Sequence, residues 1–280
     1  MNWTNHLDHF ANWLRAGHRL ESTIETRRRW VTRLADAIPD STPETITTEQ
    51  ILQWLAYPDW KPVTRKSAQV SVRRFFYWLH IAGYRDDNPT ENMLSIRVPR
   101  YQARHTPDQI LTNALGRAET TEEELILLLA ACAGLRRTEI ATLHTNDITD
   151  GWIIVTGKGG VRRIVPIHPL LEPYLALKTS GYFLPGRFAE HRHPDWVGRR
   201  ISKLLGPGYT CHQLRHWFAT TTYGSTGDLR AVQELLGHAS IATTQIYVGV
   251  DNDKLAQAVA AIPHSLPVTL RLTAGQPEGD

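Results

Sequence analysis

Six side chains in this sequence together have the chemistry to break a phosphodiester bond without a metal ion. Such a reaction needs a nucleophile, positive charge beside the non-bridging oxygens, and a proton for the leaving oxygen. The sequence offers a tyrosine, two arginines, two histidines and a lysine in the short motifs GLRRTE, TGKGG, HQLRH, LLGH and QIY. In chain order these residues are Arg136, Lys158, His212, Arg215, His238 and Tyr247.

The two arginines suit the phosphate oxygens, because a guanidinium donates parallel hydrogen bonds and stays charged. Arg215 follows His212 by three residues on one predicted helix, so both side chains can face one phosphate. Glu139 follows Arg136 by three residues and is predicted to hold that guanidinium in place. The adjacent Arg137 is an alternative to Arg136, and spacing alone does not separate the two.

The other residues suit nucleophilic attack and proton transfer. An imidazole titrates near neutrality, so His212 can shuttle the tyrosine proton, whereas His216 is expected to project elsewhere on the helix and to pack. Lys158 lies in the turn of a predicted hairpin, where it can protonate the departing 5′ oxygen. His238 begins a predicted helix, a position that suits an anion. The phenol of Tyr247 needs cations and a base to act as a nucleophile.

Each residue alone has a simpler explanation. An arginine at a helix start is usually solvated or ion-paired, a turn lysine is usually solvated, and a lone tyrosine usually packs in a core or on the surface. The glycines around Lys158 do not form a phosphate-binding P-loop, because the GxxxxGK[ST] spacing is absent. The conjunction of all six residues therefore predicts the chemistry.

Helical periodicity dominates the first hundred residues. Thr47-x-x-Gln50 resembles a capping box that starts a short helix. In the longest helix the apolar residues Val70, Phe75, Trp78 and Leu79 recur at helical spacing. The helices are expected at about residues 5–16, 22–37, from 47, and 64–82.

Residues 96–108, IRVPRYQARHTPD, contain two prolines and three arginines without a helical period. They predict an extended basic linker between a helical domain at 1–95 and a second domain at 109–262. Residues 263–280 contain three prolines and are expected to form a flexible tail.

The second domain is predicted to mix helices with a small hairpin. Thr121-x-x-Glu124 is a capping-box pattern ahead of an apolar helix that ends near Cys132. WIIVT and VRRIVPI, separated by GKGG, indicate two paired strands. The fold class is therefore mainly α with a small β-hairpin or sheet: an all-helical domain followed by an α+β domain. The other helices of the second domain are expected at about 136–143, 170–178, 194–205, 211–222, 228–236, 240–248 and 252–262.

The net charge of +3 is unevenly distributed. Residues 1–107 carry 15 Lys and Arg against 11 Asp and Glu, whereas residues 108–280 carry 16 against 17. The basic N-terminal part indicates either a polyanionic partner such as nucleic acid or a solvated basic face. The basic residues of the longest helix and the linker, which are the candidate contacts for such a polyanion, are Arg65, Lys66, Arg73, Arg74, Arg97, Arg100 and Arg104.

No metal or cofactor is expected. The thirteen histidines are scattered, with no His or Cys pairs at zinc-ligand spacing. Cys132 and Cys211 lie in apolar stretches and are expected to be buried thiols. No apolar run approaches the ~20 residues that a membrane span needs, and the N-terminus lacks a signal-peptide pattern, so we expect a cytoplasmic protein.

These motifs, in this order, resemble the tyrosine recombinase family of phage integrases and Xer-type recombinases. GLRRTEI, GKGGVRRIVPI, HQLRHWFAT and LLGHASIATTQIY match its catalytic segments with the usual gaps, and SVRRFFYWLHIAGYRDDNPT resembles the end of its core-binding domain. The resemblance implies a SAM-like core-binding domain at 1–95 and a catalytic domain at 109–262. It places the six catalytic residues on the positions named above and the supporting acid on Glu139. Cys211 stands where many members have proline.

The resemblance also implies a reaction and an assembly. Tyr247 would form a 3′-phosphotyrosyl bond, and strand exchange would pass through a Holliday junction without ATP or a divalent ion. The implied partners are double-stranded DNA with core-type sites, three further protomers in a homotetramer on two sites, and an accessory DNA-bending protein. The basic residues of the longest helix and the linker named above would then contact DNA. The resemblance also implies a nucleoid-associated protein of a bacterial or phage-infected cell.

The expected role is integration or excision of a phage or mobile element, and an Xer-like dimer resolvase is the alternative. A type IB topoisomerase and a DNA-binding regulator that has lost catalysis are more distant alternatives. The apolar stripe of the last helix either packs on its own core or docks on a neighbouring protomer. Its residues are Leu255, Ala258, Val259 and Ile262.

Overall fold

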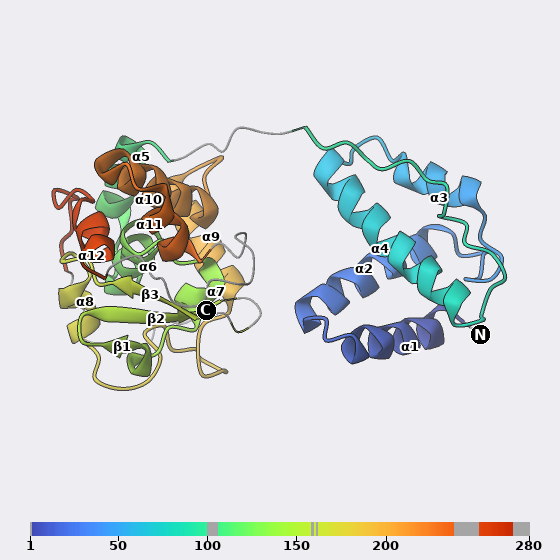
Figure 1. Ribbon diagram of the computed structural model, residues 1–280, viewed down its shortest axis with the longest axis horizontal. Helices are drawn as coiled ribbons and strands as arrows, with labels where there is room; N and C mark the ends of the chain where they lie inside the picture. The colour runs from blue at the N-terminus through green and yellow to red at the C-terminus, as the bar shows by residue number, and fades with distance from the viewer. Residues whose placement is uncertain (1, 100–105, 158–159, 161, 238–251, 271–280) are drawn as a thin grey trace. The chain divides into compact units, whose positions relative to one another are not determined.

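The computed structural model describes residues 2–99, 106–157, 160, 162–237 and 252–270. The chain forms two compact units, Met1–Tyr101 and Gln102–Asp280, and each has its own apolar core. The predicted fold class, mainly helical with a small antiparallel sheet, is confirmed (Figure 1). Among the described residues, no helix combines the length and the apolar character that a membrane crossing requires.

The first unit is built from amphipathic helices around an aromatic core. Phe10 of one helix meets Phe75 of another edge to face, with ring centroids 5.3 Å apart. The predicted capping box is present, because the Thr47 and Gln50 side chains each accept the other's backbone N–H. The helices are α1 (Trp3–Ala16), α2 (Glu21–Ala37), α3 (Thr48–Leu55) and α4 (Pro62–Ile81).

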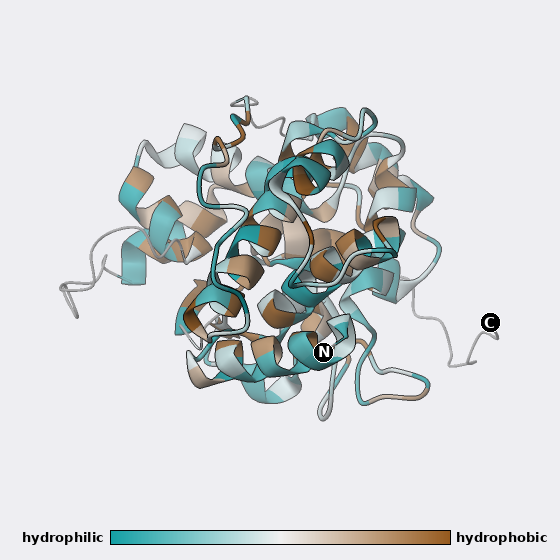
Figure 2. Ribbon diagram, turned by 90° about the vertical axis from the view of Figure 1, so that its right-hand side faces the viewer, coloured by the Kyte–Doolittle hydropathy of each residue, from teal (hydrophilic) through white to brown (hydrophobic). Residues whose placement is uncertain are grey.

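Helix α4 presents one apolar face to the core and another apolar stripe to solvent. Phe75, Trp78 and Leu79 are buried as predicted, but Val70 is 41% exposed. Val70 lies on a second stripe, in which the exposed residues Val63, Val70 and Tyr77 follow one another at seven-residue spacing. Helical periodicity alone does not distinguish such a stripe from a face that packs in the core. The colouring in Figure 2 shows apolar and polar residues on the same helices.

The second unit is organised around α6 (Thr121–Cys132), which is buried along nearly its whole length. A helix that is apolar on all sides belongs in the middle of a core, and α6 packs against α5, α7, α9 and α10. The other helices are α5 (Asp108–Arg117), α7 (Arg137–Ala141), α8 (Glu172–Ala176), α9 (Pro194–Leu205), α10 (Cys211–Thr226), α11 (Leu229–Leu236) and α12 (Asn252–Ala260).

The start of α6 differs from the prediction by one residue. Thr120, not Thr121, caps the helix, and Glu123 completes the capping box. Glu124 instead points into the core, where it accepts hydrogen bonds from the Tyr174 hydroxyl at 2.8 Å and the Thr269 N–H at 3.1 Å. The internal partners of Glu124 therefore determine which register of the motif forms the cap.

The small sheet has three strands rather than the two predicted. Strand β1 (Ile148–Thr149) pairs with β2 (Trp152–Thr156) through a tight turn in which Asp150 and Gly151 both have positive φ. Strand β2 pairs with β3 (Arg162–Pro166) in antiparallel register, with Val155 opposite Arg163. Side chains alternate between faces along a strand, so Arg163 shares the inward face of β3 with the buried Val165.

The last described segment, residues 252–270, packs against the rest of the second unit. The stripe of α12 lies in the core of its own chain. The expectation of a flexible tail is wrong for residues 263–270, because Leu266 is buried and the Thr269 N–H is bound by Glu124. His168 also fixes this segment, since its Nε2 lies 3.2 Å from the Ile262 carbonyl oxygen.

Gly134 connects α6 to α7 in a conformation that favours glycine. Its φ is +60°, and a Cβ atom there would lie 2.6 Å from Cδ1 of Phe218. The fully buried ring of Phe218 has no free space into which it can withdraw. The Gly134 carbonyl oxygen accepts a hydrogen bond from Arg215, so this turn contributes to the site described below.

We predict that Gly134→Ala destabilises the second unit by about 2–4 kcal/mol, because it combines a strained φ with overpacking. The measurement is the urea-induced unfolding transition of the full chain. The matched control is Gly116→Ala in α5, where nothing lies within 4 Å of the added Cβ; it should be neutral or stabilise by up to about 1 kcal/mol. Equal effects of the two changes would contradict the steric explanation.

Candidate active site

A buried carboxylate, Glu139, lies at the centre of the candidate site. It occupies the first turn of α7, and its side chain is only 4% exposed. Its Oε2 accepts the backbone N–H of Arg136 at 2.8 Å, and its Oε1 accepts Nη1 of the same arginine at 2.7 Å. The predicted pairing of Glu139 with Arg136 is therefore present, and it joins backbone and side chain in one local motif.

A second arginine, Arg163 of β3, binds the same carboxylate. Its Nη1 and Nη2 donate to Oε1 and Oε2 of Glu139 at 3.0 and 2.7 Å, and its Nε donates to the Leu235 carbonyl at 2.8 Å. The side chain is 7% exposed. Sequence reasoning missed this residue, although the two-residue alternation of the strand puts Arg163 in phase with the buried Val165.

These arginines keep Glu139 ionised. Burial alone would raise the pKa of its carboxyl group, but the hydrogen bonds and charge of Arg163, together with hydrogen bonds from Arg136, lower that pKa to about 2. The carboxylate is therefore charged throughout the neutral range. A charged acceptor holds the Arg136 guanidinium more firmly than a neutral one.

The predicted clamp Arg215 lies on α10 beside this group. Its Nη1 donates to the Gly134 carbonyl, its Nη2 donates to the Leu236 carbonyl, and its Nη1 lies 3.9 Å from Oε2 of Glu139. Burial, followed by the positive charges of Arg136 and Arg163, lowers the pKa of Arg215 to about 9. The guanidinium thus remains charged at neutral pH.

The resulting arginine cluster, Arg136, Arg163 and Arg215, has three positive charges around one carboxylate. Arg136 and Arg215 also share the Leu236 carbonyl as an acceptor. Arg136 is the most accessible of the three, with 38% of its side chain exposed, against 7% and 6% for the others. A site with excess positive charge and one accessible guanidinium is suited to binding an anion.

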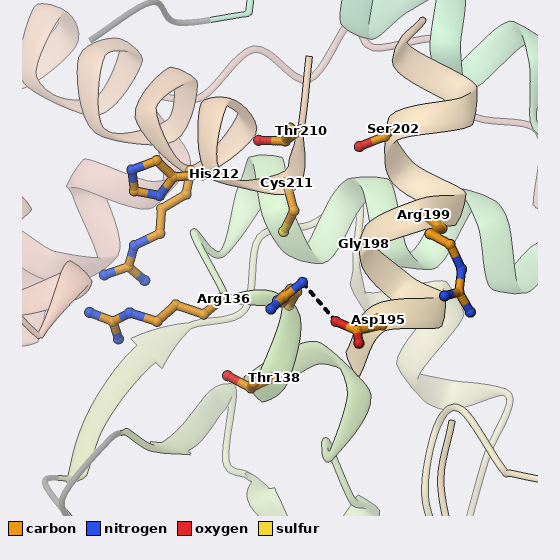
Figure 3. A pocket seen from close by; sticks show the side chains of 11 residues that line it. Arg136, Thr138, Asp195, Gly198, Arg199, Ser202, Thr210, Cys211 and His212 are labelled. Carbon is orange, nitrogen blue, oxygen red and sulfur yellow. Dashed lines mark ion pairs between the residues drawn. The ribbon is translucent and has the colours of Figure 1, made fainter. Parts of the chain in front are cut away.

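A cavity of about 640 Å³ opens beside the arginine cluster, between α7, α9 and the start of α10. Arg136 and His212 lie on one side of it, and Asp195, Arg199 and Ser202 come from α9 on the other (Figure 3). Arg137, the alternative to Arg136, pairs with Asp195 at 2.9 Å. The two neighbouring arginines therefore have different partners, and only Arg136 binds Glu139.

His212 lies at the first turn of α10 and lines the same cavity as Arg136 and Arg215. The expectation that His216 projects elsewhere is wrong, because its Nε2 lies 3.0 Å from Nε2 of His212. Residues four apart on a helix share a face, which explains the contact. One ring nitrogen must donate and the other accept, so the pair restricts the tautomer of His212.

The structure brings together Arg136, Glu139, His212 and Arg215. Lys158, His238 and Tyr247 lie outside the described residues. In the described part of the chain, no three His, Cys, Asp or Glu side chains are grouped as metal ligands would be.

The predicted DNA contacts of the first unit have different surroundings. Lys66 and Arg97 are exposed. Arg74 stacks over the Trp13 ring, with 4.7 Å between guanidinium carbon and ring centroid. Arg65 and Arg73 donate to the carbonyls of residues 57 and 93. Arg100 and Arg104 lie outside the described residues.

Arg27 of α2, which sequence reasoning missed, joins Arg74 in a basic region of the first unit. Its Nη1 donates to the Ser71 hydroxyl at 3.2 Å. Burial, then the nearby charges of Arg74 and Arg19, lower the pKa of Arg27. The run of three arginines at residues 27–29 could have indicated a basic surface, but the sequence alone does not show which of the three shares a face with Arg74.

The chain is similar to known proteins along most of its length. The phage integrase family matches residues 104–254. The tyrosine recombinase XerC of Chromobacterium violaceum is 35% identical over 210 residues, which cover 67% of this chain and 69% of the relative.

Two solved structures have related folds. The integrase of mycobacterium phage Brujita superposes with a TM-score of 0.55 at 28% identity, covering 94% of both chains. A lambda integrase tetramer bound to a Holliday junction gives a TM-score of 0.68 at 22% identity, covering 90% of this chain and 81% of that one. The second likeness supports the fold.

The family match includes α7, β3, α10 and α11, the elements that carry the arginine cluster and its backbone acceptors. It extends over more than half of the chain, and the XerC relative supports it independently at the level of sequence. The chain therefore belongs to the phage integrase family, the tyrosine recombinases, which exchange DNA strands at specific sites.

Proposed function

We propose that Arg136 and Arg215 bind the non-bridging oxygens of a scissile DNA phosphate, and that Tyr247 attacks its phosphorus. The observation that carries this proposal is the excess of positive charge around Glu139. A pentavalent phosphorane gains negative charge on these oxygens, so fixed guanidinium groups stabilise it more than the ground state. Arg136 is accessible enough to reach the phosphate while it stays bound to Glu139.

The proposed reaction conserves the phosphodiester energy. The Tyr247 oxygen forms the new bond to phosphorus, and the bond to the 5′ oxygen breaks. The phenol proton passes to His212, and Lys158 protonates the leaving oxygen. A 5′ hydroxyl of a partner strand then attacks the phosphotyrosine and releases the tyrosine. His238 is proposed as a further phosphate contact, next to the chain segment whose Leu236 carbonyl the arginines bind.

We assign DNA binding in the first unit to the exposed face of α4. Lys66 and Arg74 lie on this face together with an exposed apolar stripe. A helix of this kind fits a groove in which base edges are flanked by phosphates. Arg97, Arg100 and Arg104 are proposed as further contacts to the DNA backbone. Arg65 and Arg73 are proposed to contribute charge indirectly, because each donates to a protein carbonyl. The residues of the apolar stripe are Val63, Val70, Tyr77 and Ile81.

The proposed assembly is a homotetramer bound to two duplex sites, and the proposed reaction passes through a Holliday junction. The lambda integrase tetramer bound to a Holliday junction, which has this fold, supports both proposals. Integration or excision of a mobile element is the proposed role, supported by the phage Brujita integrase, which matches along nearly the whole chain. Dimer resolution is a second candidate, which the XerC relative favours. Sequencing the DNA that the enzyme cleaves in genomic fragments distinguishes a mobile-element junction from a chromosomal resolution site.

Covalent capture of DNA tests the chemistry. Suicide duplexes carry a nick beside a sequence selected by binding from a random pool. The native chain should form an adduct that survives denaturation, and Tyr247→Phe should form none, because it lacks the nucleophilic oxygen. The control Tyr223→Phe removes an exposed hydroxyl from α10 and should leave the adduct unchanged. An adduct with Tyr247→Phe would reassign the nucleophile.

The neighbouring arginines provide a matched pair of variants. Arg136→Ala should slow adduct formation by about 10²–10³-fold, because it removes a donor to the phosphorane oxygens. Arg137→Ala removes a group that pairs with Asp195 and should cost at most a few-fold. The measurement is the single-turnover rate at saturating enzyme. A larger loss of rate for Arg137→Ala than for Arg136→Ala would assign the phosphate contact to Arg137 instead of Arg136.

Salt dependence tests the α4 surface. Lys66→Ala should weaken DNA binding and reduce the slope of log affinity against log salt by about 0.9, because one phosphate contact is lost. The control is Arg28→Ala in the same unit, where the charge is already paired with Asp8 at 2.8 Å. Titrations at several salt concentrations give the slope. An unchanged slope for Lys66→Ala would remove that residue from the interface.

A further inference from the structure

Arg163 connects three parts of the second unit. It begins on β3, binds both oxygens of Glu139 on α7, and donates from Nε to the carbonyl of Leu235 near the end of α11. It also packs against Gly237, since a Cβ atom added there would lie 2.9 Å from Cδ of Arg163. Along the chain, Lys158 precedes Arg163 by five residues, and His238 follows Gly237 directly.

We propose that Arg163 is a positioning residue for strand transfer: its two hydrogen bonds to Glu139 hold that side chain where it orients Arg136, and its bond to the Leu235 carbonyl keeps Arg163 itself in place. This inference rests on the proposed function of that cluster. It assigns Arg163 no contact with the substrate.

The contacts of Arg163 separate its role from that of Arg136. All three of its nitrogen atoms donate to Glu139 or Leu235, and its side chain is 7% exposed. Few donors remain to bind a phosphate. Arg136 has the opposite arrangement, with an accessible side chain that only partly depends on Glu139 for its hydrogen bonds. Arg136 and Arg215 also line the cavity beside the cluster, whereas Arg163 is not among its described lining residues. Substrate contact therefore suits Arg136 and Arg215, and support suits Arg163.

The protonation state of the Glu139 carboxyl group determines how strongly Arg136 is held. Among the described residues, the titratable groups that face Glu139 are Arg136 at the N-cap of its helix, Arg163 on β3, and Arg215 and Cys211 on α10. Without Arg163 the carboxylate remains buried, loses its bidentate partner, and its pKa rises. A protonated Glu139 no longer makes a charge-assisted bond to Arg136. Loss of Arg163 should therefore disorder the clamp most at low pH.

The test measures the rate of adduct formation on suicide duplexes for Arg163→Met and Arg163→Lys between about pH 5 and pH 9. Arg163→Met should be slower than the native chain by about 100-fold near neutrality and should recover as the pH rises and Glu139 ionises. Arg163→Lys should restore part of the rate, because it returns a charge without the bidentate fork. The control Arg162→Met changes the exposed neighbour on the same strand and should follow the native profile.

A double variant separates positioning from general destabilisation. If Arg163 acts through Glu139, then Glu139→Gln with Arg163→Met should be little slower than Glu139→Gln alone, with no recovery at high pH. Additive losses in the double variant would overturn the inference. A pH-independent loss in Arg163→Met that matches its reduced thermal stability would also overturn it. In either case, adduct formation by the native chain would still uphold the proposed function. No adduct with the native chain would reject the proposed function, and the inference with it.

Discussion

The candidate site depends on one buried carboxylate held between arginines. Glu139 has little solvent contact, so only close cations keep its charge inside the protein. Arg163 and Arg136 supply them from β3 and from the start of α7, and Arg215 adds a third positive charge from α10. Three elements distant in sequence thus meet at a single group. The placement of each arginine follows from the requirement to satisfy that group.

This arrangement favours function over stability. Buried ion pairs seldom repay the cost of desolvating their charges, and an apolar cluster of similar volume would often be as stable. Here the cations also outnumber the carboxylate, so they repel one another when no anion is bound. Backbone carbonyls of Gly134 and Leu236 offset part of this repulsion. If the cluster binds the scissile phosphate, as proposed above, the phosphate charge offsets the remaining repulsion. Substrate binding would then relieve an electrostatic cost that is already present in the free protein.

Local patterns were sufficient to predict much of the fold and part of the site. The Thr47 cap, the strands β2 and β3, and the pairs Arg136 with Glu139 and His212 with Arg215 all depend on residues close in sequence. Arg163 was missed because its partners lie 24 and 72 residues away. The cap of α6 was displaced by one residue because Tyr174, 50 residues away, binds Glu124. Helix α5 was missed because it follows Pro107 directly and has no side-chain cap.

Among the described residues, each unit has its own apolar core, and the two cores share no buried residue. Side chains that pack in one unit can therefore change without disturbing the packing of the other. If the α4 surface selects the DNA sequence, as proposed above, that surface and the arginine cluster can diverge at different rates in evolution. A lineage could then acquire a new target sequence through changes in the first unit while it inherits an unaltered catalytic site.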